Sequence, residues 1–216
     1  KFHLLNLELT YPIIDLNSSG QLHLSFDELD EDVKDYNYTV IHCDADWTPS
    51  DLSEMEYLRG FAEDRIDDFN YSFSTFANYT HYDLFLPNED IAWTKSGNYL
   101  LVVKNEDTDE VIITRRFIVV DPVVKIEATI QRANDVSKIR THQEIDFRVN
   151  YESLRLRNPQ QEIWATIQQN WRTDNAIVDI KPLFVRRDEL IFDFQNQLVF
   201  PAGNEFRFFD MRDFQN

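Results

Sequence analysis

Alternation of apolar and polar residues is the dominant pattern along this chain. Leu22, Leu24 and Phe26 alternate with polar neighbours, and the same period of two recurs over 125–131 and 144–151. Such a period places one face of a strand in a core and the other face in water, which is typical of antiparallel sheets. The sequence therefore predicts several half-buried strands.

Two of these runs also predict which side chains are buried. Ile126 and Ile130 lie on the apolar face of the first run, so we expect both in a core. Glu144 and Asp146 lie on the polar face of the second run, so we expect both in water.

Further strands are predicted at 36–43, 69–76, 80–86, 99–103, 111–120, 162–168, 176–185, 190–194, 197–200 and 205–209. The polar residues 105–110 join two of them as a hairpin. One short helix is predicted, with Thr48 as its N-cap, Pro49 at its first position and Gly60 at its end.

Many strands with few helices indicate an all-β protein. We expect two tandem immunoglobulin-like antiparallel β-sandwich domains, with a single larger sandwich as the alternative. A proline after Asp121 separates two strand-like runs and sets the division into residues 1–122 and 123–216. The first part carries a net charge of -17 and the second -1, so we expect an acidic N-terminal domain followed by a nearly neutral one.

The amino-acid composition argues against several classes of function. The 216 residues carry a net charge of -18, which argues against nonspecific binding to nucleic acid or anionic lipid. A single cysteine excludes an intramolecular disulfide framework, and no apolar run is long enough for a transmembrane segment. The chain begins at Lys1 without a leader and ends in an aromatic-rich run, so we expect a removed signal or a fragment, with the second domain truncated from a longer protein.

The residues from His42 to Trp47 most resemble a chemical site. One His and one Cys without a second pair make a weak zinc site. An EF-hand loop starting at Asp44 fails, because Pro49 stands where glycine is needed and Met55 where glutamate is needed. We therefore interpret the segment as a strand end whose turn is capped by Asp44, Asp46 and Ser50, and we expect no metal and no cofactor.

The sequence offers few other candidate functional residues. Cys43 in a strand is interpreted as a small buried side chain rather than a nucleophile. The four tryptophans are interpreted as packing residues rather than a sugar-stacking platform. Trp164 is the exception, because Ile163, Ala165 and Ile167 occupy the buried face of its strand and leave it outward as a possible partner surface.

Six segments, dispersed over the first domain, form a distinctive set of motifs; they lie at 42–52, 56–61, 71–75, 79–82, 86–88 and 96–101. Together they resemble the amino-terminal domain of the type IX secretion system plug protein family of Bacteroidota. The match is strong over 36–121 and looser over 123–216. The motif positions that we expect to be structural or to lie at an interface are His42, Asp44, Asp46, Trp47, Pro49, Ser50, Tyr79, His81 and Tyr82.

The resemblance implies a protein that is not an enzyme, has no small-molecule substrate and works in the periplasm at the outer membrane. There it would close the mouth of a giant outer-membrane β-barrel translocon, its partner, when no substrate is passing. The alternative is a carbohydrate-binding β-sandwich module of an envelope glycan system, which requires at least two exposed, coplanar aromatic rings. A hydrolase with two carboxyl groups across a cleft is the third reading.

Overall fold

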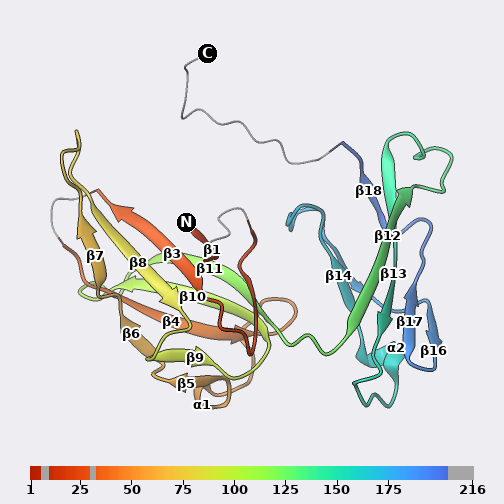
Figure 1. The fold of residues 1–216 in the computed structure, drawn as a ribbon, viewed down its shortest axis with the longest axis horizontal. Coiled ribbons are helices and arrows are strands. Elements are labelled where there is room, and N and C mark those ends of the chain that lie inside the picture. The colour runs from red at the N-terminus through yellow and green to blue at the C-terminus, as the bar shows by residue number, and fades with distance from the viewer. Residues whose placement is uncertain (6–9, 30–32, 204–216) are drawn as a thin grey trace. The chain divides into compact units, whose positions relative to one another are not determined.

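The computed structural model describes residues 1–5, 10–29 and 33–203. The chain folds as two compact units, Lys1–Asp121 and Pro122–Asn216, here called unit 1 and unit 2. Both consist almost wholly of β-strands, which confirms the predicted all-β class (Figure 1). The immunoglobulin-like strand order stays a prediction.

Unit 1 contains two larger sheets. One has the strand order β1-β3-β8-β7 and the other β2-β11-β10-β4-β6, while β5 and β9 form a separate pair. Every pairing in the unit is antiparallel except that of β2 with β11. The strands are β1 Phe2–Leu4, β2 Ile13–Asp15, β3 Leu22–Glu28, β4 Tyr36–Cys43, β5 Leu58–Gly60, β6 Glu63–Arg65, β7 Asp68–Tyr71, β8 Thr80–Leu86, β9 Ile91–Trp93, β10 Gly97–Asn105 and β11 Val111–Val120.

The core of unit 1 lies between its two larger sheets. Alternate residues of β3 and β8, such as Leu24 and Tyr82, meet alternate residues of β4 and β10, such as Val40 and Tyr99. The core is rich in aromatic rings, and Tyr99 stacks on Phe117 at 5.2 Å between ring centroids. Large rigid rings supply much apolar area at little entropic cost, so this core stabilises the frame that carries the surface loops.

The helix of unit 1 begins later than predicted. It is α1, Glu54–Tyr57, and Ser53 and Glu56 form its capping box. Thr48 cannot serve as the N-cap because its hydroxyl donates to Asp46 instead, at 2.6 Å. Pro49 lies in a β-bridge with Cys43 rather than at a helix start. The prediction was therefore wrong about both ends of the helix, because α1 stops at Tyr57 and the residues up to Gly60 form β5.

Unit 2 contains one larger sheet with the order β12-β13-β17-β16, to which β18 adds by pairing with β13, and a separate pair of β14 with β15. A second helix, α2, Pro159–Glu162, was not predicted. The strands are β12 Lys125–Arg132, β13 His142–Asn150, β14 Ala165–Ile167, β15 Ile177–Ile180, β16 Phe184–Arg186, β17 Glu189–Phe192 and β18 Val199–Pro201.

The burial pattern of unit 2 corrects two predictions. Ile126 and Ile130 of β12 are 61% and 63% exposed rather than buried, because no described strand covers that part of their face. Glu144 is fully buried rather than in water, because the backbone N–H and side-chain amide of Asn134 both donate to its carboxylate at 2.9 Å. A buried carboxylate that accepts such bonds keeps much of the stabilisation that water would give it.

Two of the predicted strands also differ from the structure, and a third is not tested by it. The strand predicted at 69–76 ends at Tyr71, because Ser74 adopts a positive φ of 58° inside a turn. The strand predicted at 176–185 is divided into β15 and β16, which pair with different strands. The strand predicted at 205–209 lies outside the described residues.

Candidate functional site

The segment from His42 to Ser50 forms a closed loop at the end of β4. Asp46 accepts hydrogen bonds from the backbone N–H and the hydroxyl of Thr48, at 3.0 and 2.6 Å, and these bonds lower the pKa of its carboxyl group. The side-chain amide of Asn98 donates to the carbonyl of Asp44 at 3.0 Å and ties the loop to β10. The loop is thus held by its own polar side chains and by the neighbouring strand.

Ser50 and Asp44 do not cap the turn as predicted. The Ser50 hydroxyl lies 2.8 Å from Nδ1 of His42 instead of meeting a backbone amide, and Asp44 contributes its backbone N–H and carbonyl. The His42 ring packs edge-on against Tyr99, at 5.1 Å between ring centroids. Trp47 has a positive φ of 69°, and the guanidinium of Arg116 lies 4.7 Å from the centroid of its ring.

Cys43 is an internal packing residue. Its side chain is buried at the end of β4, and burial raises the pKa of the thiol above its ordinary value. Because the thiolate is the nucleophilic form of cysteine, this environment disfavours covalent chemistry at Cys43. The loop around Cys43 is therefore a structural turn held by hydrogen bonds rather than a reactive centre.

The second motif, Tyr79 to Tyr82, enters β8. Tyr82 is fully buried and stacks on Phe26 at 5.1 Å, and its hydroxyl donates to the carbonyl of Lys34 at 2.8 Å. Tyr79 closes the β7–β8 hairpin, because its carbonyl accepts from the N–H of Ser72 and its own N–H donates to the Ser72 hydroxyl, both at 2.9 Å. These tyrosines fix the base of the hairpin.

His81 joins β8 to β3 on the outer face of the sheet. Its Nδ1 lies 2.5 Å from a carboxylate oxygen of Asp27, and its Nε2 lies 3.3 Å from Asp83, which also contacts His23 at 2.6 Å. The hydrogen bond with Asp27 is the main cause of a raised His81 pKa, and the charge of Asp83 adds to it. The protonated ring is therefore favoured in the folded protein.

Replacing His81 by glutamine is expected to cost more stability at pH 6 than at pH 8. The pKa of His81 is higher in the folded protein than in the unfolded chain, where it is about 6.5. The protonated ring therefore stabilises the fold fully below about pH 6.5, and this stabilisation is lost as the pH rises through the folded-state pKa. Because the side chain is 38% exposed, solvent screening keeps the effect below about 1 kcal/mol. Denaturant unfolding at the two pH values measures it, and an equal cost at both would contradict the assignment.

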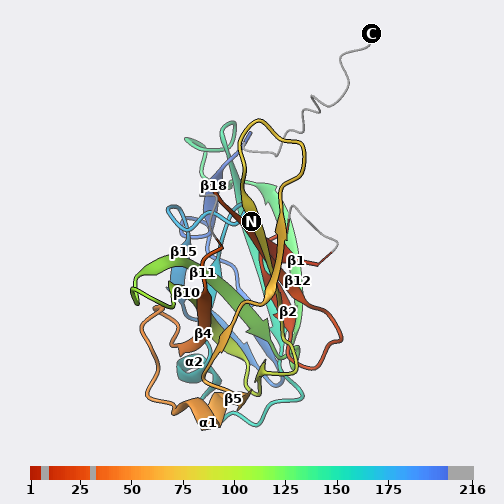
Figure 2. The ribbon, with the colours of Figure 1, turned by 90° about the vertical axis from the view of Figure 1, so that its left-hand side faces the viewer.

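The tip of the β7–β8 hairpin is the most apolar exposed surface of unit 1. Phe73 is 93% exposed and Phe76 is fully exposed, and Tyr71 adds a third exposed ring. Residues 69–80 contain no Asp, Glu, Lys or Arg, although the chain as a whole is 28% charged. Figures 1 and 2 show this hairpin projecting past the neighbouring strands of its sheet. Exposed aromatic side chains gathered on a closed loop are typical of a protein contact.

This aromatic tip was not predicted from the sequence. The prediction of a continuous strand over 69–76 makes Phe73 one of several alternating rings rather than the tip of a turn. The usable signal was the absence of charge across an aromatic run that also holds Ser74, Thr75 and Asn78, residues that favour turns.

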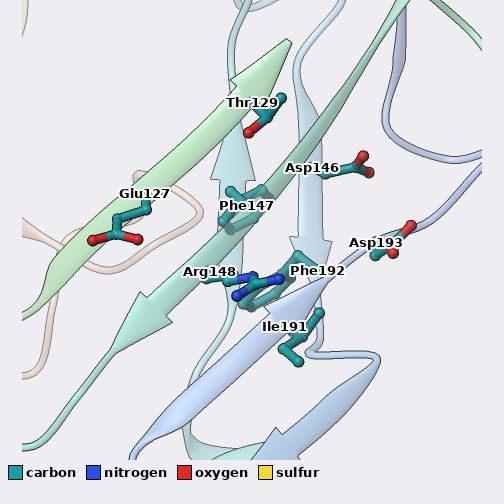
Figure 3. Close-up of a pocket in the computed structure, with 8 residues that line it drawn as sticks. All are labelled: Glu127, Thr129, Asp146, Phe147, Arg148, Ile191, Phe192 and Asp193. Atoms are coloured by element: carbon teal, nitrogen blue, oxygen red, sulfur yellow. The ribbon is translucent and has the colours of Figure 1, made fainter. Parts of the chain in front are cut away.

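A second candidate lies on the larger sheet of unit 2. It is a polar depression of about 330 Å³, whose lining includes Glu127, Asp146, Arg148 and Asp193. Figure 3 shows these side chains together. Glu144, Asp146 and Asp193 each offer one oxygen within 4.8 Å of the others. Asn134 already bonds both oxygens of Glu144, and Gln131 donates to Asp146 at 2.6 Å, so we assign no metal to this group.

Replacing Asp146 by asparagine is expected to stabilise unit 2 at pH 7. Burial, then the charges of Asp193 and Glu144, raise the pKa of Asp146, so ionisation of this group penalises the folded state. The gain should shrink as the pH falls through the raised folded-state pKa, because the wild-type carboxyl is then also neutral. Thermal melting at pH 7 and pH 4 measures both effects.

Asp135 offers a matched contrast to Asp146. Hydrogen bonds from Ser137 lower its pKa, so Asp135→Asn should lose stability at pH 7 rather than gain it. If Asp146→Asn also destabilises the protein at pH 7, the cost ascribed to its ionisation is contradicted.

The tryptophans lie in different environments, and Trp47 is half-buried beneath Arg116. Trp93 is buried in the core as predicted, whereas Trp171 is exposed and contradicts the packing interpretation. Trp164 is 56% exposed, as the alternation around it predicts. The ammonium of Lys181 lies 5.4 Å from the centroid of the Trp164 ring and covers one face of it. This arrangement does not favour the stacking platform that a carbohydrate-binding module requires.

Taken together, the fold and these sites define an all-β protein that carries a loop of exposed aromatic side chains on an acidic unit. The family model described as "Type 9 secretion system plug protein 1st domain" matches residues 1–121. The chain therefore belongs to the type 9 secretion system plug protein family, as its motifs indicated, and to a family of structural secretion components.

One solved structure is similar over nearly the whole chain. It is the crystal structure of a hypothetical protein from Parabacteroides merdae ATCC 43184, with a TM-score of 0.90 and 38% sequence identity. The alignment covers 96% of this chain but 52% of that one, so the chain spans about half the length of this relative. The comparison with curated proteins gives no match. Neither helix in the described part of the chain has the length and apolarity to cross a bilayer.

Proposed function

We propose that the protein is a periplasmic plug, associated with the outer membrane, which occludes the large β-barrel translocon of the type IX secretion system. The observation that carries the proposal is the family match over all of unit 1. The mechanism is steric: a rigid sandwich seated at the mouth of an aqueous pore blocks passage, and its release is coupled to the arrival of substrate or of another component.

The surface of unit 1 suggests how the plug docks. The uncharged aromatic tip, with Phe73 and Phe76, supplies apolar area that becomes buried on contact, and the burial of each ring is worth roughly 2 kcal/mol. The surrounding unit carries most of the net charge of -18, which steers it toward basic loops of the barrel. Affinity then comes chiefly from the tip, and orientation and encounter rate from the charge.

Affinity purification from the native envelope tests the proposal. The protein is tagged in its own cell, solubilised gently, and its partners are identified by mass spectrometry. We expect a very large outer-membrane barrel in a ratio near one to one. Recovery of glycan-processing proteins, or of no barrel, would contradict the plug assignment and favour the carbohydrate-binding alternative.

Salt dependence tests the electrostatic part separately. If the acidic surface steers docking, the association rate with the purified barrel should fall steeply as salt rises from about 50 to 500 mM, because the Debye length shortens over this range. The dissociation rate, which depends on the aromatic tip, should change much less. A salt-independent association rate would contradict the steering.

A further inference from the structure

The strand β12, at one end of the larger sheet in unit 2, is unusually long for an edge strand. It has eight residues, whereas the strands that end the other larger-sheet orders and the far end of this one, β1, β7, β2, β6 and β16, have three or four. Its register with β13 runs from Lys125 to Arg132 without a bulge, and all eight residues are exposed. Proteins protect sheet edges with short strands, bulges or proline, because an unpaired edge accepts another strand. β12 has none of these features, so its edge is suited to pairing.

The backbone groups of alternate residues on β12 point away from β13. The N–H of Ile145, which lies opposite Ile130, donates to the carbonyl of Leu198 on the other side of β13, at 2.9 Å. Ile130 and Ile145 are therefore a non-hydrogen-bonded pair, whose N–H and C=O groups point away from each other. By the same alternation, Ala128 and Ile126 also direct their N–H and C=O groups outward. Among residues 1–5, 10–29 and 33–203, no strand pairs with this outer edge.

The side chains of these alternate residues form an exposed apolar strip. Ile126 and Ile130 are largely exposed, and Ala128 lies between them on the same face. On the other face of the strand, the ammonium of Lys125 lies 2.6 Å from the carboxylate of Glu127 and neutralises it. The edge therefore combines outward backbone groups with apolar side chains and little net charge, which favours an added strand that is apolar on one face.

The strand is complementary to a second copy of itself. When two copies of β12 pair antiparallel about Ala128, Ile126 of each copy lies opposite Ile130 of the other copy. The backbone groups of all three residues point outward, so each of these opposite pairs can exchange hydrogen bonds. The two contacts between Ile126 and Ile130 then cover the exposed apolar strip of both copies.

The charges of β12 are compatible with the same register. Lys125 lies opposite Gln131 of the second copy, and Glu127 lies opposite Thr129, so no like charges face each other directly. Unit 2 carries only -1 of the net charge of -18, so two copies of this unit approach with little repulsion. A strand of another protein would have to match this pattern of side chains, whereas a second copy matches it by symmetry.

We propose that two copies of the protein pair antiparallel along β12, about a two-fold axis at Ala128, and join the larger sheets of their second units into one continuous sheet. A contact along one strand is small beside the roughly 1,200 Å² or more that stable interfaces bury, so the dimer is weak and depends on protein concentration. The contact uses residues of unit 2, whereas the docking proposed above uses unit 1. The dimer is therefore independent of the proposed plug function.

Disulfide trapping tests the register of this pairing. In Ala128→Cys the two Cα atoms on the axis should lie about 5.5 Å apart, within the range of a disulfide. In the matched control, Gln131→Cys, the two positions are six residues apart along the paired strands, roughly 20 Å. Cys43 stays in place because it is buried. Under mild oxidation Ala128→Cys should link two chains in at least about fivefold higher yield, and equal yields would overturn the proposal.

Sedimentation measures the dimer without new cysteines. Ile130→Lys places a charge on the apolar strip, and the control, Val136→Lys, places the same charge on an 86% exposed residue between β12 and β13. Between about 10 μM and 1 mM, the wild type and the control should shift from monomer toward dimer, and Ile130→Lys should raise the dissociation constant at least about tenfold. A wild type that remains monomeric at about 1 mM would overturn the proposal. Equal dimerisation of the two variants would also overturn it, by placing the contact away from β12.

Discussion

Replacing Phe73 and Phe76 together by serine is expected to weaken binding to the translocon barrel by about a hundredfold or more. Each ring lies free on the surface of the isolated protein and would be buried in the complex, at roughly 2 kcal/mol per ring. Aromatic anchors of this kind dominate binding energy at interfaces, and each 1.4 kcal/mol is about a factor of ten in affinity. Titration of the purified barrel with each variant measures the loss.

The fold should survive this double substitution, because exposed side chains contribute within about 0.5 kcal/mol to stability. Met55→Ser is a matched control, since Met55 is also almost fully exposed but lies on α1 rather than on the hairpin. We expect the control to bind as the wild type does. If both variants bind equally well, the hairpin tip is not the docking surface.

The largest effect on stability is expected from Gly60→Ala, which should cost unit 1 about 3 kcal/mol or more. Gly60 has a φ of +103°, a conformation that side chains rarely adopt. A Cβ atom there would lie 1.9 Å from the backbone carbonyl oxygen of Asp90, in the strand pairing of β5 with β9. The backbone must shift to relieve that contact, and the pairing with Ile91 is lost.

Thermal melting measures this cost, with Gly20→Ala as the control. At Gly20 the nearest atom to an added Cβ is the Ser18 hydroxyl oxygen at 3.4 Å, which is ordinary contact. We expect the control to stay within about 0.5 kcal/mol of the wild type. Gly60→Ala should lower the melting temperature by roughly 10 °C or more. Similar melting temperatures for the two variants would contradict the account of the β5–β9 pairing.

The strands that sequence analysis predicted best are those whose alternation matches a real two-sided environment. Those at 36–43 and 80–86 agree with β4 and β8 at both ends. The strand at 111–120 also agrees with β11 at both ends, although the first half of β11 is exposed on both faces. The helix start failed because two local signals competed: Thr48 and Pro49 look like a cap and a first turn, but Asp46 takes the Thr48 hydroxyl. The alternation of apolar and polar residues also does not show whether a second layer of structure covers the apolar face of a strand. Ile126 was wrongly placed in a core for this reason.

The candidate site was predictable only in part. The motif residues around His42 and Tyr82 could be found from the sequence. Their structural roles, however, depend on hydrogen bonds with residues distant in the sequence, such as Asn98 and Lys34. The exposure of Phe73 depends on where β7 stops, and this follows from turn geometry at Ser74 rather than from periodicity. The burial of Glu144 depends on hydrogen bonds from Asn134, ten residues away. The alternation of apolar and polar residues around Glu144 does not indicate that pairing.

Ion conductance through the purified translocon barrel tests the central claim most directly. The barrel is reconstituted in a planar bilayer, and the protein is added on the periplasmic side. The plug account predicts that the current falls to near zero at a ratio close to one to one, and that the Phe73→Ser, Phe76→Ser double variant leaves the pore open at the same concentration. An unchanged current through a barrel that demonstrably carries the bound protein would contradict the account.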